Sequence, residues 1–219
     1  MTIPADLFPA SWLWLANALL AALLVAAVRR APWRLLKRSE LQHVFYASAL
    51  LVALLWQMRA GIAPELQLHL LGMTSLTLMF GWRLAIVAGT LAAALSIVAT
   101  GGAWPTLGIS ALLGAALPVA ITHALSRVVE RVLPAHFFIY VWVNAFLGAM
   151  ISAGTAYLCL IGLASAAAAS AAALAPDYLP VLPLLMFPEG FINGAVMTML
   201  VAYRPEWVSS FDDERYLNR

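Results

Sequence analysis

The chain has 219 residues, of which 64% are hydrophobic and only 10% are charged, and its formal net charge is +2. Soluble domains carry about 25% charged residues, so this composition excludes a soluble globular protein, which would lack the polar side chains to cover its surface. It predicts an all-α integral membrane protein, because helices satisfy their own backbone groups where water is absent.

About seven transmembrane helices are predicted from the apolar runs. Trp12 and Trp14 mark one end of the first run as a membrane interface, and a cluster of five basic residues follows its other end. Lys and Arg favour cytoplasmic loops, so the N-terminus is expected outside and the C-terminus inside. The predicted segments are Ser11–Val28, Leu41–Met58, Leu66–Gly81, Leu84–Thr100, Thr106–Ala124, Phe137–Leu163 and Leu182–Tyr203.

This alternation places every Lys and Arg except Arg59 on the cytoplasmic side. It makes residues 1–10 an outer segment and residues 204–219 a cytoplasmic tail of a single domain, 1–219. No basic patch is interleaved with aromatic residues, so the expected partner is membrane lipid and not nucleic acid. The lone Cys159 has no disulfide partner within the chain. We expect the protein in the cytoplasmic (inner) membrane of a bacterium.

The third segment, Leu66–Gly81, is short for a full crossing of about 20 residues. It follows a short loop, residues 59–65, and its polar side chains, His69 among them, lie on one face. Such segments line a site or pack inside the bundle more often than they face lipid. In later segments, Pro118 predicts a kink, and the alanine-rich tract 164–175 is interpreted as a helix extension or an outer loop.

Motifs of common enzymes are missing from the sequence. It has no Gly-rich phosphate loop ending in Lys-Ser/Thr, no His-Glu-x-x-His and no cysteine pair. An enzyme is therefore the weakest functional class, and no resident cofactor is expected. If transport requires ATP, the ATPase must be another subunit.

Polar residues at membrane depth are few, and His69 is the leading candidate ligand. Neutral imidazole suits nickel, copper, zinc and cobalt, although a histidine that is only hydrogen-bonded at an interface is the alternative. Glu189 would be either an acceptor for a ligating histidine or a buried structural carboxylate. Asn193 and Met73 are further candidates for contacts around a metal.

The remaining methionines and histidines are assigned to ordinary roles. Thioethers in apolar helices usually serve packing, although several that converge would suit copper(I), and histidines near the ends of segments are usually interfacial. The residues concerned are Met58, Met79, Met186, Met197, Met199, His43, His123 and His136.

Several different short motifs are distributed along the chain. They are Met1-Thr-Ile-Pro4 with Phe8-Pro9, His69-Leu-Leu-Gly72, Thr106-Leu-Gly108, Pro188-Glu-Gly190 and Asn193-Gly194. Together and in this order they resemble the cobalt/nickel-uptake permease family, the substrate-capturing membrane component of energy-coupling-factor transporters.

The resemblance implies a planar nitrogen site for the metal. In the family the chain begins Met-His-Ile-Pro, and the ligands are the N-terminal amine, the backbone nitrogen and imidazole of the histidine at position 2, and the imidazole of the His-Leu-Leu-Gly step. By resemblance His69 is the last of these ligands and Met1 supplies the amine. Planar nitrogen donors favour nickel or cobalt over zinc, which prefers a tetrahedron. The implied partners are ABC-type ATPase subunits and a coupling transmembrane subunit at the cytoplasmic face.

This sequence departs from the family at position 2. Thr2 has no imidazole, so the four-nitrogen set cannot form in the family's way. A small residue at position 2 also permits removal of Met1, after which the amine and hydroxyl of Thr2 would join the site. In addition, Ile109-Ser-Ala-Leu-Leu-Gly114 replaces an asparagine-rich stretch of the family.

Three functions remain open from the sequence. The first is the substrate-capturing component of a transition-metal uptake transporter, which binds its cargo at the outer face near the N-terminus and His69. The second is a metal-free membrane module with the same fold and a role in assembly or regulation. The third is a carrier of a small organic substrate that uses a pocket between the third and seventh segments.

Overall fold

Helices dominate the fold, as expected for apolar segments whose backbone groups are beyond the reach of water. The computed structural model describes residues 4, 6–63, 66–168, 175–212 and 216. Five helical stretches are long and apolar enough to cross a membrane, and a shorter apolar helix, Ser39–Leu55, accompanies them. The five stretches are Ala10–Arg30, Met73–Thr100, Trp104–Val132, Phe137–Ala167 and Ala175–Tyr203. The chain is therefore an all-α membrane protein with one small β-hairpin.

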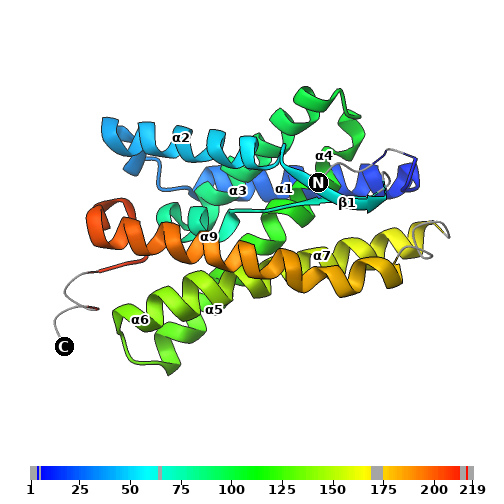
Figure 1. The fold of residues 1–219 in the computed structure, drawn as a ribbon. Coiled ribbons are helices and arrows are strands. Elements are labelled where there is room, and N and C mark those ends of the chain that lie inside the picture. The colour runs from blue at the N-terminus through cyan, green and yellow to red at the C-terminus, as the bar shows by residue number, and fades with distance from the viewer. Residues whose placement is uncertain (1–3, 5, 64–65, 169–174, 213–215, 217–219) are drawn as a thin grey trace.

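The individual elements follow one another through short connections (Figure 1). The α-helices are α1 (Ala10–Arg30), α2 (Ser39–Leu55), α3 (Met73–Thr100), α4 (Leu107–Ala111), α5 (Leu117–Val132), α6 (Phe137–Ile139), α7 (Gly148–Ala167) and α9 (Leu182–Tyr203). The π-helical segments are Leu112–Ala116 and Tyr140–Leu147, and the 3₁₀ turns are Leu35–Lys37, Trp104–Thr106, Leu179–Val181 and Pro205–Trp207. The strands are β1 (Arg59–Ala63) and β2 (Leu66–His69).

The interpretation of Leu66–Gly81 as one short helix is wrong. Leu66–His69 forms strand β2, which pairs antiparallel with β1, and helix begins only at Met73. The predicted loop 59–65 is likewise largely strand. The sequence carries the signal for this, because apolar and polar residues alternate strictly from position 66 to 70, which is the period of a strand.

Helix α3 doubles back on itself at Gly81. Its φ of 77° and ψ of 162° are non-helical and lie in a region that favours glycine. In a straight helix Met73 and Gly89 would be about 24 Å apart. Instead, a Cβ built on Gly89 would lie 2.7 Å from the Met73 Cε, so the two arms of α3 pack side by side. Gly81 is therefore the tip of a helical hairpin, which divides the segment predicted at 66–81 from the one predicted at 84–100.

Two later predicted segments are helical but irregular. The segment predicted to kink at Pro118 contains a π-helical turn, Leu112–Ala116, shortly before the proline. The stretch Phe137–Ala167 begins with the π-helical residues 140–147. Residues 169–174 of the alanine-rich tract lie outside the described residues.

At one end of the bundle, which we call the basic end, Arg204 and the C-terminal segment contact other elements. Arg204 Nη1 lies 3.9 Å from Glu40 Oε1, so the end of α9 meets the start of α2. The Ser209 N–H donates to the Met79 carbonyl at 2.9 Å, which brings the C-terminal segment to the tip of the α3 hairpin. Figure 1 shows this segment in red at the left-hand end, with the β-hairpin towards the other end. There Arg59 donates to Ser96 Oγ at 3.2 Å.

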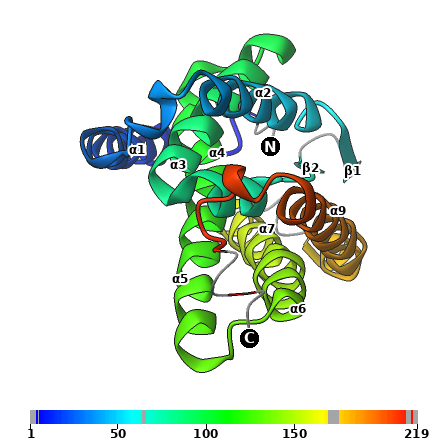
Figure 2. The same cartoon turned by 90° about the vertical axis from the view of Figure 1, so that its left-hand side faces the viewer.

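Seen from the red end, the elements surround the two arms of α3 (Figure 2). Helix α1 lies at one edge, and α7 and α9 lie on the opposite side beside each other. Gly108, at the start of α4, allows contact with α1, because a Cβ there would lie 2.4 Å from the Asn17 backbone nitrogen. The Asn17 side chain completes this contact by accepting from the Gly108 N–H at 3.1 Å and donating to the Pro105 carbonyl at 2.7 Å.

The close approach of the two α3 arms can be tested with Gly89→Ala. The added methyl would lie 2.7 Å from the Met73 Cε in the other arm and 2.4 Å from the Ala115 Cβ of the neighbouring π-helical turn, so we expect a loss of about 1–3 kcal/mol of stability. Thermal unfolding in detergent measures it. Gly162→Ala in α7 is the matched control, because no atom lies within 4 Å of its Cβ position, and its melting temperature should be unchanged or higher. Equal melting temperatures for the two variants would contradict the hairpin packing.

Candidate metal-binding site

His69 ends strand β2, and a non-helical turn, His69–Gly72, connects it to α3. The histidine is 1% exposed, and Leu71 is fully buried. Buried backbone groups that form no regular ladder must find other hydrogen-bond partners, and a membrane offers no water to supply them. The chemistry of the site therefore begins with the groups that satisfy this turn.

Two aromatic side chains satisfy carbonyl groups of the turn. The Tyr157 hydroxyl, from α7, donates to the His69 carbonyl. The Trp56 indole N–H, just after α2, donates to the Leu71 carbonyl at 2.9 Å. Both aromatic residues are almost wholly buried, at 1% and 0% exposed. The turn is thus held from two sides, by α7 and by the residue that follows α2.

Glu189 satisfies the amide groups of the same turn. Its Oε2 accepts from the Leu71 N–H at 2.6 Å, and its Oε1 accepts from the Gly72 N–H at 2.7 Å. Asn193, one helical turn further along α9, donates to Oε1 at 2.9 Å. Bonds to an ionised carboxylate are about twice as strong as those between neutral groups. Of the two roles considered for Glu189, these contacts indicate the buried structural carboxylate, which fixes the backbone beside His69.

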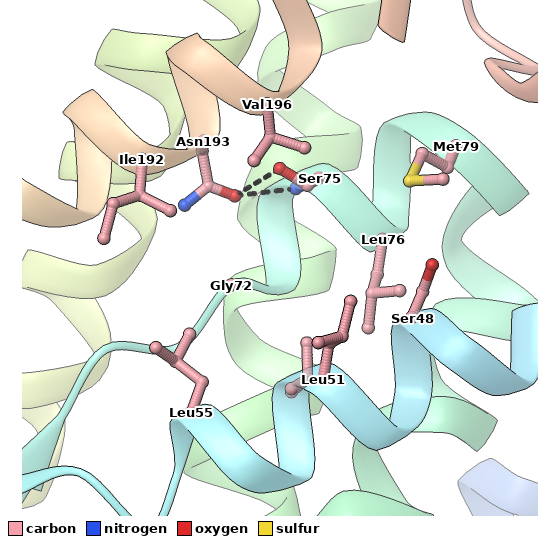
Figure 3. Close-up of a pocket in the computed structure, with 11 residues that line it drawn as sticks. Ser48, Leu51, Leu55, Gly72, Ser75, Leu76, Met79, Ile192, Asn193 and Val196 are labelled. Carbon is pink, nitrogen blue, oxygen red and sulfur yellow. Dashed lines mark hydrogen bonds between the residues drawn. The ribbon is translucent and has the colours of Figure 1, made fainter. Parts of the chain in front are cut away.

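Asn193 also caps the first turn of α3. Its Oδ1 accepts from both the backbone N–H and the hydroxyl of Ser75, each at 2.8 Å (Figure 3). Helices usually receive such a cap from a polar side chain at the N-cap position, but the N-cap residue of α3 is Gly72, which has no side chain. Helix α9 thus positions both the turn and the helix that follows it.

The His69 ring is held in one tautomer. Its Nδ1 lies 2.9 Å from the Leu70 carbonyl, and because a carbonyl only accepts, Nδ1 carries the proton. In the neutral ring the lone pair is then on Nε2. The ring packs against the indole of Trp56, with 4.8 Å between centroids and 31° between planes. An imidazole oriented in this way has, in its neutral form, the chemistry of a metal ligand.

Within the described part of the chain, no group of three or more His, Cys, Asp or Glu residues could hold a metal ion. The proposed ligands Met1 and Thr2 lie outside the described residues. Met73 packs its thioether near Gly89 in the α3 hairpin, where a Cβ would be 3.2 Å from Sδ. Of the donors predicted from the sequence, the structure thus describes only His69 as a candidate for direct ligation.

The remaining candidates are exposed or pack against other residues. Met58 and Met199 are 73% and 61% exposed, and Met186 packs at Gly154. His43 and His136 are exposed, and the partly exposed His123 packs against Trp82 near the hairpin tip.

Trp56 and Tyr157 are the contributors that the sequence reading missed. A usable signal exists for Tyr157, since a tyrosine in the middle of an apolar run needs a partner for its hydroxyl. Trp56 gives a weaker signal, because tryptophan near the end of an apolar segment usually marks the membrane interface.

An apolar pocket of about 260 Å³ lies beside the turn, between α2, the start of α3 and α9 (Figure 3). Gly72, Ser75 and Asn193 form one edge, and most of the other lining side chains are aliphatic, such as Leu51 and Val196. The His69 ring does not line it. The pocket is therefore unsuited to a metal ion, although its wall includes residues that hold the turn.

A comparison with protein families identifies the chain. The family model CbiM, described as the cobalt uptake substrate-specific transmembrane region, matches residues 2–207. The chain belongs to the CbiM family. Members of this family are components of transporters and not enzymes, and the five apolar helices agree with an integral membrane protein.

Solved structures support the same fold for this CbiM-family protein. One described as a truncated transition metal transporter aligns with a TM-score of 0.74 at 15% identity, over 93% of this chain and 99% of that chain. Another, described as a transition metal transporter, aligns with a TM-score of 0.69 at 15% identity, over 94% of this chain and 93% of that chain. No curated protein sequence matches.

Glu189→Gln tests the role of the carboxylate in this CbiM-family protein. The amide has one acceptor oxygen instead of two, so the N–H of Leu71 or Gly72 would face an NH₂ group. We expect a loss of about 1–3 kcal/mol, measured by thermal unfolding in detergent. Glu206→Gln is the control, because that exposed carboxylate only meets Arg204, at 3.4 Å, and its loss should change stability by less than about 0.5 kcal/mol. A Glu189→Gln protein as stable as the control would show that the turn does not depend on the carboxylate.

Proposed function

We propose that this protein is the substrate-capturing membrane component of an uptake transporter for a divalent transition metal of the cobalt or nickel type. The observation that carries the proposal is the buried His69 imidazole at the end of a fixed non-helical turn. Membership of a family of cobalt-uptake transmembrane components supports the class of cargo. In this proposal the metal is the cargo and not a resident cofactor.

The environment of His69 supports its role as a ligand. Histidines that bind metals usually donate their second ring N–H to a carbonyl or carboxylate, which orients the ring. The Nδ1–H bond to the Leu70 carbonyl has this form, and it leaves the lone pair on Nε2. Imidazole nitrogen suits cobalt and nickel. The turn is already held by Trp56, Tyr157 and Glu189, so binding would cost little ordering of His69 itself.

The other ligands would come from the N-terminal segment. Either the amine of Met1 or, after its removal, the amine and hydroxyl of Thr2 would complete the site on the outer face. The outside location follows from the positive-inside rule, since the contacts of the basic loops lie at the opposite end of the bundle from Arg59, the register partner of His69.

ABC-type ATPase subunits and a coupling transmembrane subunit are the proposed partners. The chain has no phosphate-binding loop of its own, so energy from ATP would have to come from such subunits. They would contact the end of the bundle that carries the basic loops, in the inner membrane of a bacterium.

A second candidate function is a carrier of a small organic substrate. The apolar pocket between α2, the start of α3 and α9 is the observation that favours it, since pockets of about 300–1,000 Å³ suit small organic ligands. The match to a family of cobalt-uptake transmembrane components favours the metal function over this one.

His69→Ala decides between a metal site and a metal-free module. The purified protein, equilibrated with micromolar Co²⁺ or Ni²⁺ and measured by elemental analysis, should hold metal that the variant loses. Because a direct ligand is removed, affinity should fall by more than about 100-fold, the upper end of losses from outer contacts. His43→Ala is the control, since His43 is exposed and bonds only within α2. A wild-type protein that binds no metal at these concentrations would overturn the proposal.

Thr2→His tests whether the rest of the site is intact. Restoring an imidazole at position 2 adds a nitrogen donor that favours nickel and cobalt, so affinity for Ni²⁺ should rise in titrations of the purified protein. Intact-mass measurement first establishes whether Met1 is retained in both proteins. An unchanged affinity in a variant that retains Met1 would contradict a site that the N-terminus and His69 share.

A further inference from the structure

The first arm of α3, residues 73–80, is a short rod with a glycine joint at each end. Gly72 has φ 67° and Gly81 has φ 77°, and in the described chain only Gly101 shares a positive φ. The rod is about 12 Å long. Gly81 has nothing within 4 Å of its Cβ position, so the surroundings leave this joint sterically open.

The outer end of the rod is held by α9. Glu189 accepts from the Gly72 N–H at 2.7 Å, and Asn193 accepts from the Ser75 N–H at 2.8 Å. These contacts continue directly into the His69 turn through the Leu71 N–H, which also bonds to Glu189. Glu189 therefore contacts both the turn and the start of the rod.

The inner end of the rod is held by the C-terminal segment. The Ser209 N–H donates to the Met79 carbonyl at 2.9 Å, and the Ser210 N–H donates to the Leu78 carbonyl at 3.2 Å. The Ser210 hydroxyl also donates to the Leu78 carbonyl at 2.8 Å. These carbonyls belong to the last turn of the rod, where a helix lacks partners of its own. The segment 209–210 therefore replaces the missing continuation of the helix.

The C-terminal segment is itself fastened to the rest of the basic end. Ser210 Oγ lies 2.7 Å from the Tyr140 hydroxyl at the start of the π-helical segment. Phe211 packs edge-on against Tyr140, with centroids 5.0 Å apart. The Trp207 indole N–H donates to Glu40 Oε1 at 3.0 Å, which ties the segment to α2. A protein that binds this face would therefore contact or displace residues that cap the rod.

We infer that the segment Ser209–Phe211 positions the His69 turn through the rod, so that the outer site and the basic face are mechanically coupled. A helix of eight residues is unstable alone and keeps its shape only through its contacts, so loss of the inner cap weakens the whole rod. The glycine joints can absorb the resulting change in φ and ψ. The mechanical link stands on these contacts, and its consequence for cargo rests on the proposed function.

The coupling has a thermodynamic counterpart. If release of the segment from the rod weakens cargo binding, bound cargo must strengthen the attachment of the segment by the same factor. A partner acting at the basic face would then sense whether the outer site is loaded. The same attachment would let that partner loosen the site during transport.

Ser209→Pro tests the link in the full-length protein in detergent or nanodiscs without metal. Proline has no N–H, so the bond to the Met79 carbonyl is lost. Hydrogen exchange of the amides at Leu71, Gly72 and Ser75, about 6–12 Å away along the helix axis, should become at least about tenfold faster. Ser209→Ala is the matched control, because it keeps the N–H and loses only a 3.5 Å hydroxyl contact.

Unchanged exchange at residues 71–75, with faster exchange at the C-terminal segment alone, would overturn the inference. If Ser209→Pro does not fold, Tyr140→Phe replaces it: it keeps the ring packing, removes the bond to Ser210, and should accelerate the same amides in the same direction. Equal exchange in Tyr140→Phe and wild type would then overturn the inference. The readout needs no metal, so failure of the metal-binding proposal and failure of this link are separate results.

Discussion

Three residues of irregular backbone, Leu70–Gly72, follow His69 inside a bundle built for a membrane, and their hydrogen bonds constrain much of the structure. Water cannot satisfy them there, and each unsatisfied group would cost several kcal/mol. Glu189 meets this demand most directly, with one carboxylate oxygen for each of the two amides at the end of the turn. The charge itself is tolerable at this depth because those amides and Asn193 surround it.

The same constraint explains why α3 is a hairpin with a short first arm. The strand and turn occupy the chain up to Gly72, so only eight residues remain before Gly81 reverses its direction. The reversal works because glycine can adopt the positive φ at Gly81 and because Gly89 lets the second arm approach Met73. Packing at small residues is the usual means by which helices associate closely in membranes. The outcome is a short helical arm whose first turn adjoins the His69 turn.

A binding site and its energy source are expected on opposite faces in an uptake system, and the distribution of features in this CbiM-family protein suits that division. His69 pairs with Arg59 at one end of the bundle, whereas Arg204 and the hairpin tip lie at the other. The rod 73–80 is the shortest covalent path described between them. Its two ends are capped by different parts of the chain. A change in the contacts at one end can therefore alter the position of the other end.

Composition and charge pattern by themselves determined the class of protein, since so few charged residues cannot cover a soluble domain and helices are the simplest way to satisfy backbone inside lipid. The motif His69-Leu-Leu-Gly72 also identified the candidate ligand, and the last predicted segment coincides with α9. The strand at 66–69 was missed because leucine favours helices, although its alternation with polar residues was visible. Only the tertiary structure decided that Glu189 serves the turn and that Trp56 and Tyr157 join it. Their partners are backbone groups up to 118 positions away. Every residue type has the same backbone groups, so the sequence does not indicate which of them a side chain will bind.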